Sequence, residues 1–225
     1  MASLTPRLKL GVLISGRGSN LQSLINACAD PAYPAEIALV ISNVPGAQGL
    51  ARAEQAGIPT QTIDHKAFDG REAFERAVDE TLRGAKTDLV CLAGFMRILT
   101  GDFLKARPGR VINIHPSLLP AFKGVHVHEQ VLAAGVRFSG CTVHVVVPEM
   151  DAGPIIAQAC VPVHPDDTAE TLAARVLAQE HRIYPLAVRM IAEGRTRIEN
   201  GRVFIKKAAP PDGSLVNPDP DKPGA

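Results

Sequence analysis

The chain has 225 residues, of which 46% are hydrophobic and 21% are charged. These proportions are typical of a soluble globular protein that can bury a substantial core. A formal net charge of +1 gives no basis for an extended nucleic-acid groove, although local positive charge can still hold one phosphate. The first apolar run is too short for a membrane span, and polar residues interrupt it where a signal peptide would continue. We therefore expect a cytoplasmic protein with no nucleic-acid or membrane partner.

Strands and helices alternate in the first half of the chain. Short apolar runs predict strands at 10–15, 37–42, 60–64, 89–93 and 111–114. One helix is expected after Ser19, where Ser19 and Gln22 have the spacing of a capping box. Two more are expected at 47–56 and 71–83, each ended by the glycine that follows it. This order predicts right-handed crossovers and an α/β fold with a doubly wound, mainly parallel sheet.

The pattern changes beyond Pro116. Strands are expected near 141–147 and 155–163, followed by a long helix over 168–193. Asn200-Gly201 between two short apolar segments predicts a C-terminal hairpin with a type I′ turn. We expect one domain over residues 1–207 and a mobile tail over 208–225. The tail is rich in Pro, Asp and Gly, and it has too little apolar surface to offset the entropy of ordering.

The four cysteines are predicted to be reduced core residues, because they are widely spaced, form no CxxC pair and fall mostly in apolar stretches; they are Cys28, Cys91, Cys141 and Cys160.

Ligands of such a sheet bind where loops leave the carboxyl ends of its strands. This rule selects four loops, at 15–20, 94–99, 113–116 and 148–154. In the first, Gly18 and its neighbours lead from a strand into a helix, so backbone N–H groups and the helix dipole can face an anion. The loop is neither a Walker A motif nor a full dinucleotide fingerprint, since Leu21 replaces the third glycine. A monophosphate fits it, and an ordinary tight turn is the alternative.

The second loop is unusually apolar for a segment near solvent. A flat aromatic ligand would explain this, with Met96, Ile98 and Leu99 in apolar contact and backbone groups bonding the ring edge. The alternative is that these side chains begin the next helix and face the core.

Asn113 and His115 carry the strongest chemical signal. They lie two residues apart on a predicted strand, so both side chains project from the same face. A carboxamide donor beside an imidazole suits stabilising an oxyanion while a proton moves. A single buried histidine can instead be a hydrogen-bonded core residue.

Asp151 belongs to the fourth loop, where Asp151-Ala152-Gly153 is ordinary turn chemistry unless the turn folds over His115. In that case the carboxylate would hold a charged imidazole or orient a proton-carrying water.

Several other polar residues are of types that can bind a metal or a ligand. His126 and His128 form a His-x-His pair and His144 lies on a strand, but no recognised zinc spacing is present, so we expect no metal. In the long helix, Gln179 is expected on the buried stripe and Glu180 at its border. Such groups form a solvated edge or a site for a cationic amine.

Taken together, the motifs resemble the phosphoribosylglycinamide formyltransferases, folate-dependent enzymes of purine synthesis. The resemblance covers residues 8–206 and rests on LISGRGSNLQ, FDGREAFERAV, LAGFMRIL, INIHPSLLPAFKG, MDAGPII and QEHRIYP, in that order. It implies a formyltransferase-type Rossmann-like fold. It also implies transfer of the formyl group of 10-formyltetrahydrofolate, as co-substrate and without a metal, to the amine of glycinamide ribonucleotide. A monomer or a homodimer would fit.

The resemblance also implies residue roles. Asn113 and His115 would be the oxyanion donors and proton carrier, with Asp151 supporting His115. The ribonucleotide would be bound by Gly18, Ser19, Asn20, Gln179 and Glu180. Folate contacts would come from Arg71, Met96, Arg97, Ile98, Leu99, Asn113, Val147, Pro148, Glu149, Met150 and Asp151. Arg17 departs from the small or amide side chain common in the family, and it either adds a phosphate contact or points into water.

Three rivals use parts of the same pattern. A formyltetrahydrofolate hydrolase would use the same Asn, His and Asp with water as acceptor, but would carry a further amino-terminal domain and need no phosphate loop. A formyltransferase for initiator transfer RNA would need another domain and a more basic surface. A non-catalytic nucleotide-binding module would keep the glycine loop, with no reason to place Asn113 beside His115.

Overall fold

A seven-stranded sheet with the order β3-β2-β1-β4-β5-β6-β7 forms the centre of the protein. The structure is a computed structural model that describes residues 6–209 and 213–217. The strands are β1 (Leu8–Ile14), β2 (Ala35–Ser42), β3 (Thr60–Thr62), β4 (Leu89–Leu92), β5 (Val111–His115), β6 (Phe138–Val145) and β7 (Ile155–Pro162). From β3 to β5 the neighbouring strands are parallel, whereas β6 is antiparallel to both β5 and β7. The predicted doubly wound, mainly parallel sheet is confirmed.

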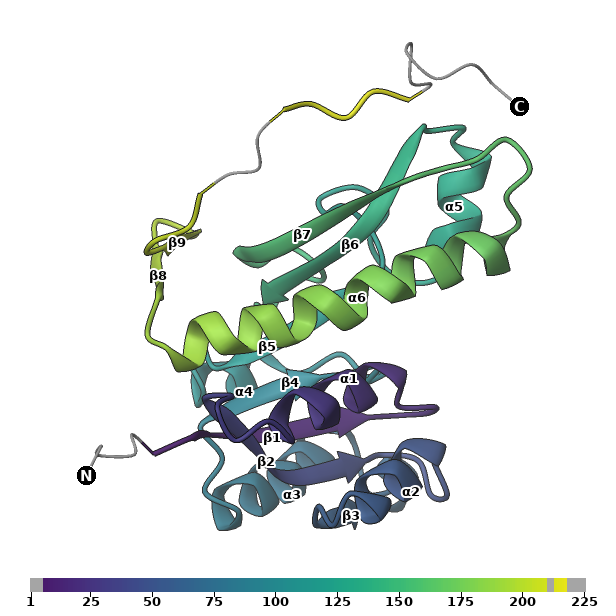
Figure 1. The fold of residues 1–225 in the computed structure, drawn as a ribbon. Coiled ribbons are helices and arrows are strands. Elements are labelled where there is room, and N and C mark those ends of the chain that lie inside the picture. Colours follow the sequence, from purple (N-terminus) through teal and green to yellow (C-terminus); the bar gives the residue numbers. More distant parts are fainter. Residues whose placement is uncertain (1–5, 210–212, 218–225) are drawn as a thin grey trace.

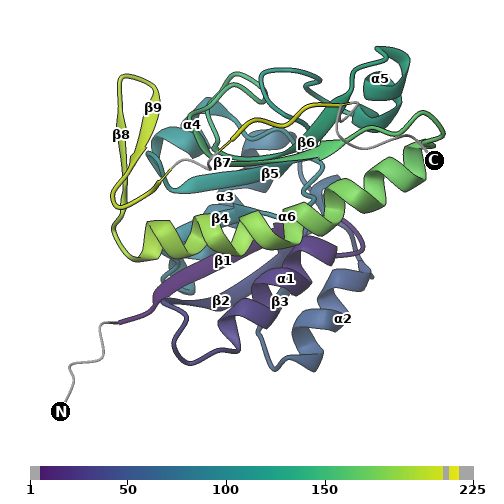
Figure 2. The ribbon, with the colours of Figure 1, turned by 45° about the horizontal axis from the view of Figure 1, so that its top comes forward.

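Helices cover both faces of this sheet (Figure 1). They are α1 (Ser19–Cys28), α2 (Gln48–Gln55), α3 (Arg71–Gly84), α4 (Gly101–Lys105), α5 (Val127–Ala133) and α6 (Ala169–Ala192), with a short 3₁₀ turn η1 (His65–Ala67). Figure 2 shows α1, α2 and α6 on one side of the sheet and α3 behind it. Val12 of β1 packs in the core under α1 and α6, while the adjacent Leu13 packs in the core under α3. Burial on both faces explains the continuous apolar runs of the parallel strands.

The beginning of α1 differs from the predicted capping box. Gly18 is the N-cap, no side chain caps the helix, and Ser19 is already helical. Gly18 has a φ of 71°, and a Cβ built on it would lie 2.7 Å from the Cα of Gly49 in α2. The Gly49 N–H also donates a hydrogen bond to the Gly16 carbonyl over 3.0 Å. Close packing of the loop against α2 therefore determines where α1 begins. Among the residues that the structure describes, no side chain accepts a hydrogen bond from the N–H groups at the start of α1, which leaves these groups available to a ligand.

Three further expectations need correction. Gly84 is the last residue of α3 and does not stop it, since the helix continues to the cap at Ala85. The strand expected at 141–147 begins earlier, at Phe138, and ends at Val145. Cys160 is exposed, because it lies on edge strand β7 and projects from the face opposite that of the buried Val161. The other three thiols are buried or half-buried, and all four are unpaired.

The C-terminal hairpin is confirmed as β8 (Thr196–Glu199) paired with β9 (Arg202–Ile205). Asn200 and Gly201 both have positive φ angles, 49° and 72°, as a type I′ turn requires. Of the predicted tail, 208–209 and 213–217 form no helix or strand, and the Asn217 side chain donates to the Arg137 carbonyl. Residues 210–212 and 218–225 lie outside the described residues, so the mobile tail and the domain boundary at 207 stay predictions. Within the described part, no helix has the length and apolarity needed to cross a bilayer.

Candidate active site

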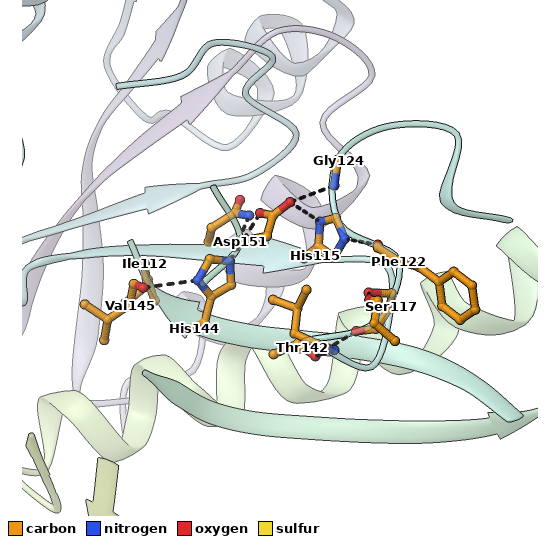
Figure 3. Close-up of polar contacts among 12 residues, drawn as sticks. Ile112, His115, Ser117, Phe122, Gly124, Thr142, His144, Val145 and Asp151 are labelled. Carbon is orange, nitrogen blue, oxygen red and sulfur yellow. Dashed lines mark hydrogen bonds and ion pairs between the residues drawn. The ribbon is translucent and has the colours of Figure 1, made fainter. Parts of the chain in front are cut away.

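Asn113 and His115 project from one face of β5 near its carboxyl end. The antiparallel register pairs Asn113 with His144 and His115 with Thr142, so four polar side chains of β5 and β6 share this face (Figure 3). His115 is buried, with 4% of its surface exposed, and Asn113 is half-buried. The sheet thus fixes an amide and an imidazole side by side on rigid backbone.

Asp151 reaches this face from the turn between β6 and β7. Its Oδ2 lies 3.5 Å from His115 Nδ1 and accepts a hydrogen bond from the Gly124 N–H over 2.9 Å. A positive φ of 50° at Asp151 turns the chain so that the carboxylate lies over β5. The turn therefore folds over His115, and ordinary turn chemistry does not account for Asp151.

The other nitrogen of His115, Nε2, lies 2.9 Å from the carbonyl oxygen of Phe122. A carbonyl only accepts, so Nε2 carries a proton. Nδ1 faces the Asp151 carboxylate, which also accepts. Hydrogen-bond acceptors therefore face both ring nitrogens of His115.

His144 is a site residue that sequence reasoning considered only as a metal ligand. Its side chain is 2% exposed, and its Nε2 lies 3.3 Å from Asn113 Nδ2 and 3.7 Å from Asp151 Oδ1. Burial lowers the pKa of His144, while the Val145 carbonyl and Asp151 oppose this shift in part. The sequence signal was present, since Thr142 and His144 alternate with apolar residues as Asn113 and His115 do. What was missing was the strand register.

The loop after β1 forms a hollow of about 230 Å³ in front of α1. It is lined by residues 15–20 together with Ala93, Gly94 and Met96, so it opens beside the loop that follows β4. The Ser15 hydroxyl joins the two loops, because it accepts from the Met96 N–H over 2.8 Å and donates to Asn43 Oδ1 over 2.6 Å. Arg17 is exposed.

Glu180 lies behind this hollow and is buried, with 6% of its surface exposed. Asn20 Nδ2 donates to Glu180 Oε2 over 2.7 Å, while Asn20 Oδ1 is buried with no partner among the described residues. Burial raises the pKa of Glu180, and the Asn20 hydrogen bond partly opposes the rise. The expected order on α6 was wrong: Glu180 is four residues from both Val176 and Tyr184 and shares their buried stripe, whereas Gln179 is half-buried at its border.

The apolar side chains of the loop after β4 differ in their exposure. Met96 and Ile98 are 69% and 56% exposed. Exposure of these apolar side chains to water is unfavourable unless a ligand covers them. Leu99 is 5% exposed and packs in the core under α3, so little of its side chain is open to a ligand. Arg97 is half-buried, and its Nε has no partner in the described part of the chain.

Two further segments border the site. Arg71 is exposed at the first position of α3, and Phe74 of that helix stacks on Phe95 with ring centroids 6.5 Å apart. This contact holds the start of α3 against the loop after β4. On the other side Val147 is half-buried, Pro148 and Met150 are exposed, and exposed Glu149 lies 3.6 Å from Lys123 Nζ.

The two histidines of the His-x-His pair lie in different surroundings. His126 is exposed and lies 3.7 Å from Glu129, while burial lowers the pKa of His128. No cluster of three or more His, Cys, Asp or Glu in the described ranges has the geometry to hold a metal ion.

The chain is similar in sequence, over most of its length, to enzymes of purine biosynthesis. The phosphoribosylglycinamide formyltransferase of Escherichia coli (strain K12) is 45% identical over 207 residues, which are 92% of this chain and 98% of that protein. The trifunctional purine biosynthetic protein adenosine-3 of Bos taurus is 54% identical over 198 residues, 88% of this chain. The chain spans only about a fifth of the length of that relative, since the match covers 20% of it.

Solved structures agree in fold. The glycinamide ribonucleotide transformylase 1 of Symbiobacterium toebii superposes with a TM-score of 0.87 at 50% identity, covering 88% of this chain and 94% of that one. A formyltetrahydrofolate deformylase from Pseudomonas syringae pv. tomato superposes at 0.84 with 27% identity, covering 90% of this chain and 67% of that one. The formyl transferase family model matches residues 8–188, which include β1 to β7 and most of α6. The chain therefore belongs to the formyl transferase family.

Proposed function

We propose that this protein transfers the formyl group of 10-formyltetrahydrofolate to the amine of glycinamide ribonucleotide in purine biosynthesis. The observation that carries the proposal is the convergence of Asn113, His115 and Asp151 on one sheet face. The names of the Escherichia coli and Symbiobacterium toebii relatives support the choice of substrate.

The proposed reaction begins when the primary amine attacks the formyl carbon. A C–N bond forms and the carbonyl oxygen becomes an oxyanion, which the Asn113 amide and protonated His115 stabilise. One proton then passes from the attacking nitrogen to the departing folate nitrogen, the C–N bond to folate breaks, and the carbonyl re-forms. Because Nε2 of His115 is engaged by Phe122, we assign the mobile proton to Nδ1, with Asp151 as its relay.

We assign the ribonucleotide to the hollow in front of α1. Gly18, Ser19 and Asn20 present the uncapped helix terminus to the phosphate, and the helix dipole favours its negative charge. Buried Glu180 lies behind this terminus and accepts a hydrogen bond from Asn20, which leaves its second oxygen for a donor group of the substrate. Half-buried Gln179 borders the same region.

We assign the folate to the surface between the loop after β4 and the turn after β6. Exposed Met96, Ile98 and Met150 would cover the flat ring, and backbone groups of 96–99 would bond its edge. Arg71 at the start of α3 supplies a positive charge for a folate carboxylate. The proposed chemistry uses no metal, and its partners are small molecules in the cytoplasm.

Formyltetrahydrofolate hydrolysis is the second candidate, favoured by the structural likeness to the Pseudomonas syringae deformylase. The two functions differ in their need for the phosphate hollow. Glycinamide ribonucleotide and the matching riboside without phosphate separate them as acceptors. Formylation of the ribonucleotide with at least about tenfold weaker use of the riboside supports the proposal, since one charge-assisted contact contributes about 1.5–3 kcal/mol. Equal rates with both acceptors would contradict the proposal. Formyl loss at a rate that depends on neither acceptor would also contradict it.

A further inference from the structure

His144 is a buried imidazole at the centre of the site that the proposed reaction does not use. It lies on β6, directly opposite Asn113 in the antiparallel register, and 2% of its side chain is exposed. Three polar groups surround its ring: the Val145 carbonyl at 3.1 Å from Nδ1, and Asn113 Nδ2 and Asp151 Oδ1 near Nε2. Figure 3 shows the ring between Val145 and the Asp151 carboxylate.

These partners determine which nitrogen of His144 carries the proton. The Val145 carbonyl can only accept a hydrogen bond, so Nδ1 is the donor. The amide nitrogen of Asn113 can only donate, so Nε2, at 3.3 Å, is the acceptor. The ring is therefore neutral, with its hydrogen on Nδ1 and a lone pair on Nε2.

A protonated ring would fit the same surroundings poorly. Its Nε2–H would face the N–H of Asn113, and the nearest carboxylate oxygen, Asp151 Oδ1, lies 3.7 Å away, beyond hydrogen-bond distance. The titratable groups that face the ring are Asp151 and His115. Burial outweighs both the Val145 carbonyl and the Asp151 carboxylate and lowers the pKa of His144, which agrees with the neutral form.

The lone pair on Nε2 has a consequence for Asn113. One N–H of its carboxamide is held by His144, so the second N–H of the same nitrogen stays on the open face of β5 beside His115. If the amide turned over, its oxygen would lie against the lone pair of Nε2, and an acceptor would occupy the place of the donor. An oxyanion needs donors that are aimed before the charge develops.

We propose that His144 is a positioning residue, whose neutral Nδ1–H tautomer fixes the Asn113 carboxamide with its nitrogen toward the formyl oxygen. This inference rests on the proposed function for the identity of the oxyanion. It assigns His144 no contact with substrate and no proton transfer. It adds to the site a residue that sets the orientation of a donor.

The first test reads the tautomer directly and needs no substrate. Long-range ¹⁵N–¹H correlation spectra of the full chain, with His144 assigned by its loss in His144→Gln, give the shifts of both ring nitrogens between pH 6 and 8. A pyrrole-type Nδ1 and a pyridine-type Nε2 across this range are expected. An Nε2–H tautomer or an imidazolium at pH 7 would overturn the proposal, whatever the enzyme's activity.

The second test compares two replacements of the same side chain. In His144→Gln the Oε1 atom takes the place of Nε2 as acceptor, whereas in His144→Phe the ring volume stays and the acceptor is lost. We expect kcat to fall about tenfold in His144→Phe with KM within about twofold, and to stay within about threefold of wild type in His144→Gln, as loss of one hydrogen bond implies. Melting temperatures identify any general loss of structure.

A third measurement keeps the proposal testable if His144→Phe folds poorly. Single-turnover rates of Asn113→Ala and of Asn113→Ala combined with His144→Leu, which lacks an acceptor, should be equal, because without Asn113 there is no amide to orient. Equal kcat losses in the Gln and Phe variants, or a further rate loss from His144→Leu in the Asn113→Ala background, would show that His144 acts through general packing. Either result would contradict the proposal. Absence of formyl transfer in the wild type would instead count against the proposed function, leaving the tautomer test unaffected.

Discussion

The Asp151 carboxylate lies 3.5 Å from His115 Nδ1, although His115 ends β5 at its carboxyl end and Asp151 follows a strand that ends beside the amino end of β5. Because β6 is antiparallel to β5, it ends with Val145 opposite Ile112, at the amino end of β5. The turn after β6 therefore crosses the sheet face to reach His115. The contact between Asp151 and the Gly124 N–H ties this turn to the loop after β5. The Asp151 carboxylate thus lies between the buried rings of His115 and His144.

Replacing Asp151 by Asn keeps the shape of the side chain and removes its charge. We expect kcat to fall by about 10²- to 10⁴-fold, the range that acid–base assistance contributes. His115→Ala should have a loss of the same order. Circular dichroism and melting temperature should stay close to wild type for Asp151→Asn, since the amide keeps the side-chain volume and its oxygen can still accept from the Gly124 N–H. A near-normal turnover in either variant would refute their assigned roles.

The glycine loop offers a matched pair of substitutions. A Cβ on Gly18 would meet the backbone of Gly49 at a φ of 71°, whereas a Cβ on Gly16 has nothing within 4 Å. We expect Gly18→Ala to lower the free energy of unfolding by at least about 1–2 kcal/mol, the cost of a left-handed conformation for a residue with a Cβ.

Chemical denaturation of both variants measures this difference. Gly16→Ala should stay within about 0.5 kcal/mol of wild type, as substitutions in open space do. Comparable losses in the two variants would mean that close packing against α2 does not set this loop.

The buried carboxyl group of Glu180, behind the phosphate hollow, is expected to lower the stability of the folded protein when it is ionised. Its pKa is raised by burial, so the folded protein binds this proton more tightly than the unfolded chain does. Stability from this group is therefore lost as pH rises from the unfolded pKa, about 4.3, through the raised folded value. In Glu180→Gln the Oε1 atom still accepts from Asn20 and no charge is buried.

We expect Glu180→Gln to be more stable than wild type at pH 8 and nearly equal to it at pH 4, because only wild type must bury a charge at the higher pH. The KM for the ribonucleotide should rise in the same variant. Thermal unfolding of both proteins at the two pH values gives the comparison. A wild type that is more stable at pH 8 would show that the buried carboxylate contributes to folding.

In the loop after β4, neighbouring residues Ile98 and Leu99 are expected to have different roles, one in ligand binding and one in core packing. Ile98→Ala should raise the KM for the formyl-folate with an unchanged melting temperature, because the Ile98 side chain is 56% exposed. Leu99→Ala should instead cost about 2–5 kcal/mol of stability, as truncation in a packed core does. Initial rates at varied folate concentration and denaturant titrations distinguish the two effects. A stability loss in Ile98→Ala without a change in KM would argue against a ligand surface there.

Much of the fold was predictable because hydrophobic periodicity reports burial directly. The parallel strands are buried on both faces and read as continuous apolar runs, and the hairpin follows from Asn200-Gly201. The start of α1 was not predictable from local residues. Its cap depends on the approach of Gly18 to Gly49, a contact between elements far apart in the chain.

The site was predictable to the extent that it lies within single strands. Asn113 and His115 share a face because of strand geometry alone. The places of Asp151 and His144 depend on the register between β5 and β6, which no single strand encodes. Glu180 was expected at the border of the buried stripe of α6 but lies within it. The expected stripe was too narrow, because the buried face also includes Tyr184 and Val188.

The most direct test of the central claim follows loss of the formyl group from 10-formyltetrahydrofolate with the purified protein, with and without glycinamide ribonucleotide. We expect formyl loss only when the ribonucleotide is present, in equal amount to the formylated ribonucleotide that appears. Formyl loss at the same rate without the ribonucleotide would contradict it and identify a hydrolase. No formyl loss in either case would contradict it in favour of a binding protein.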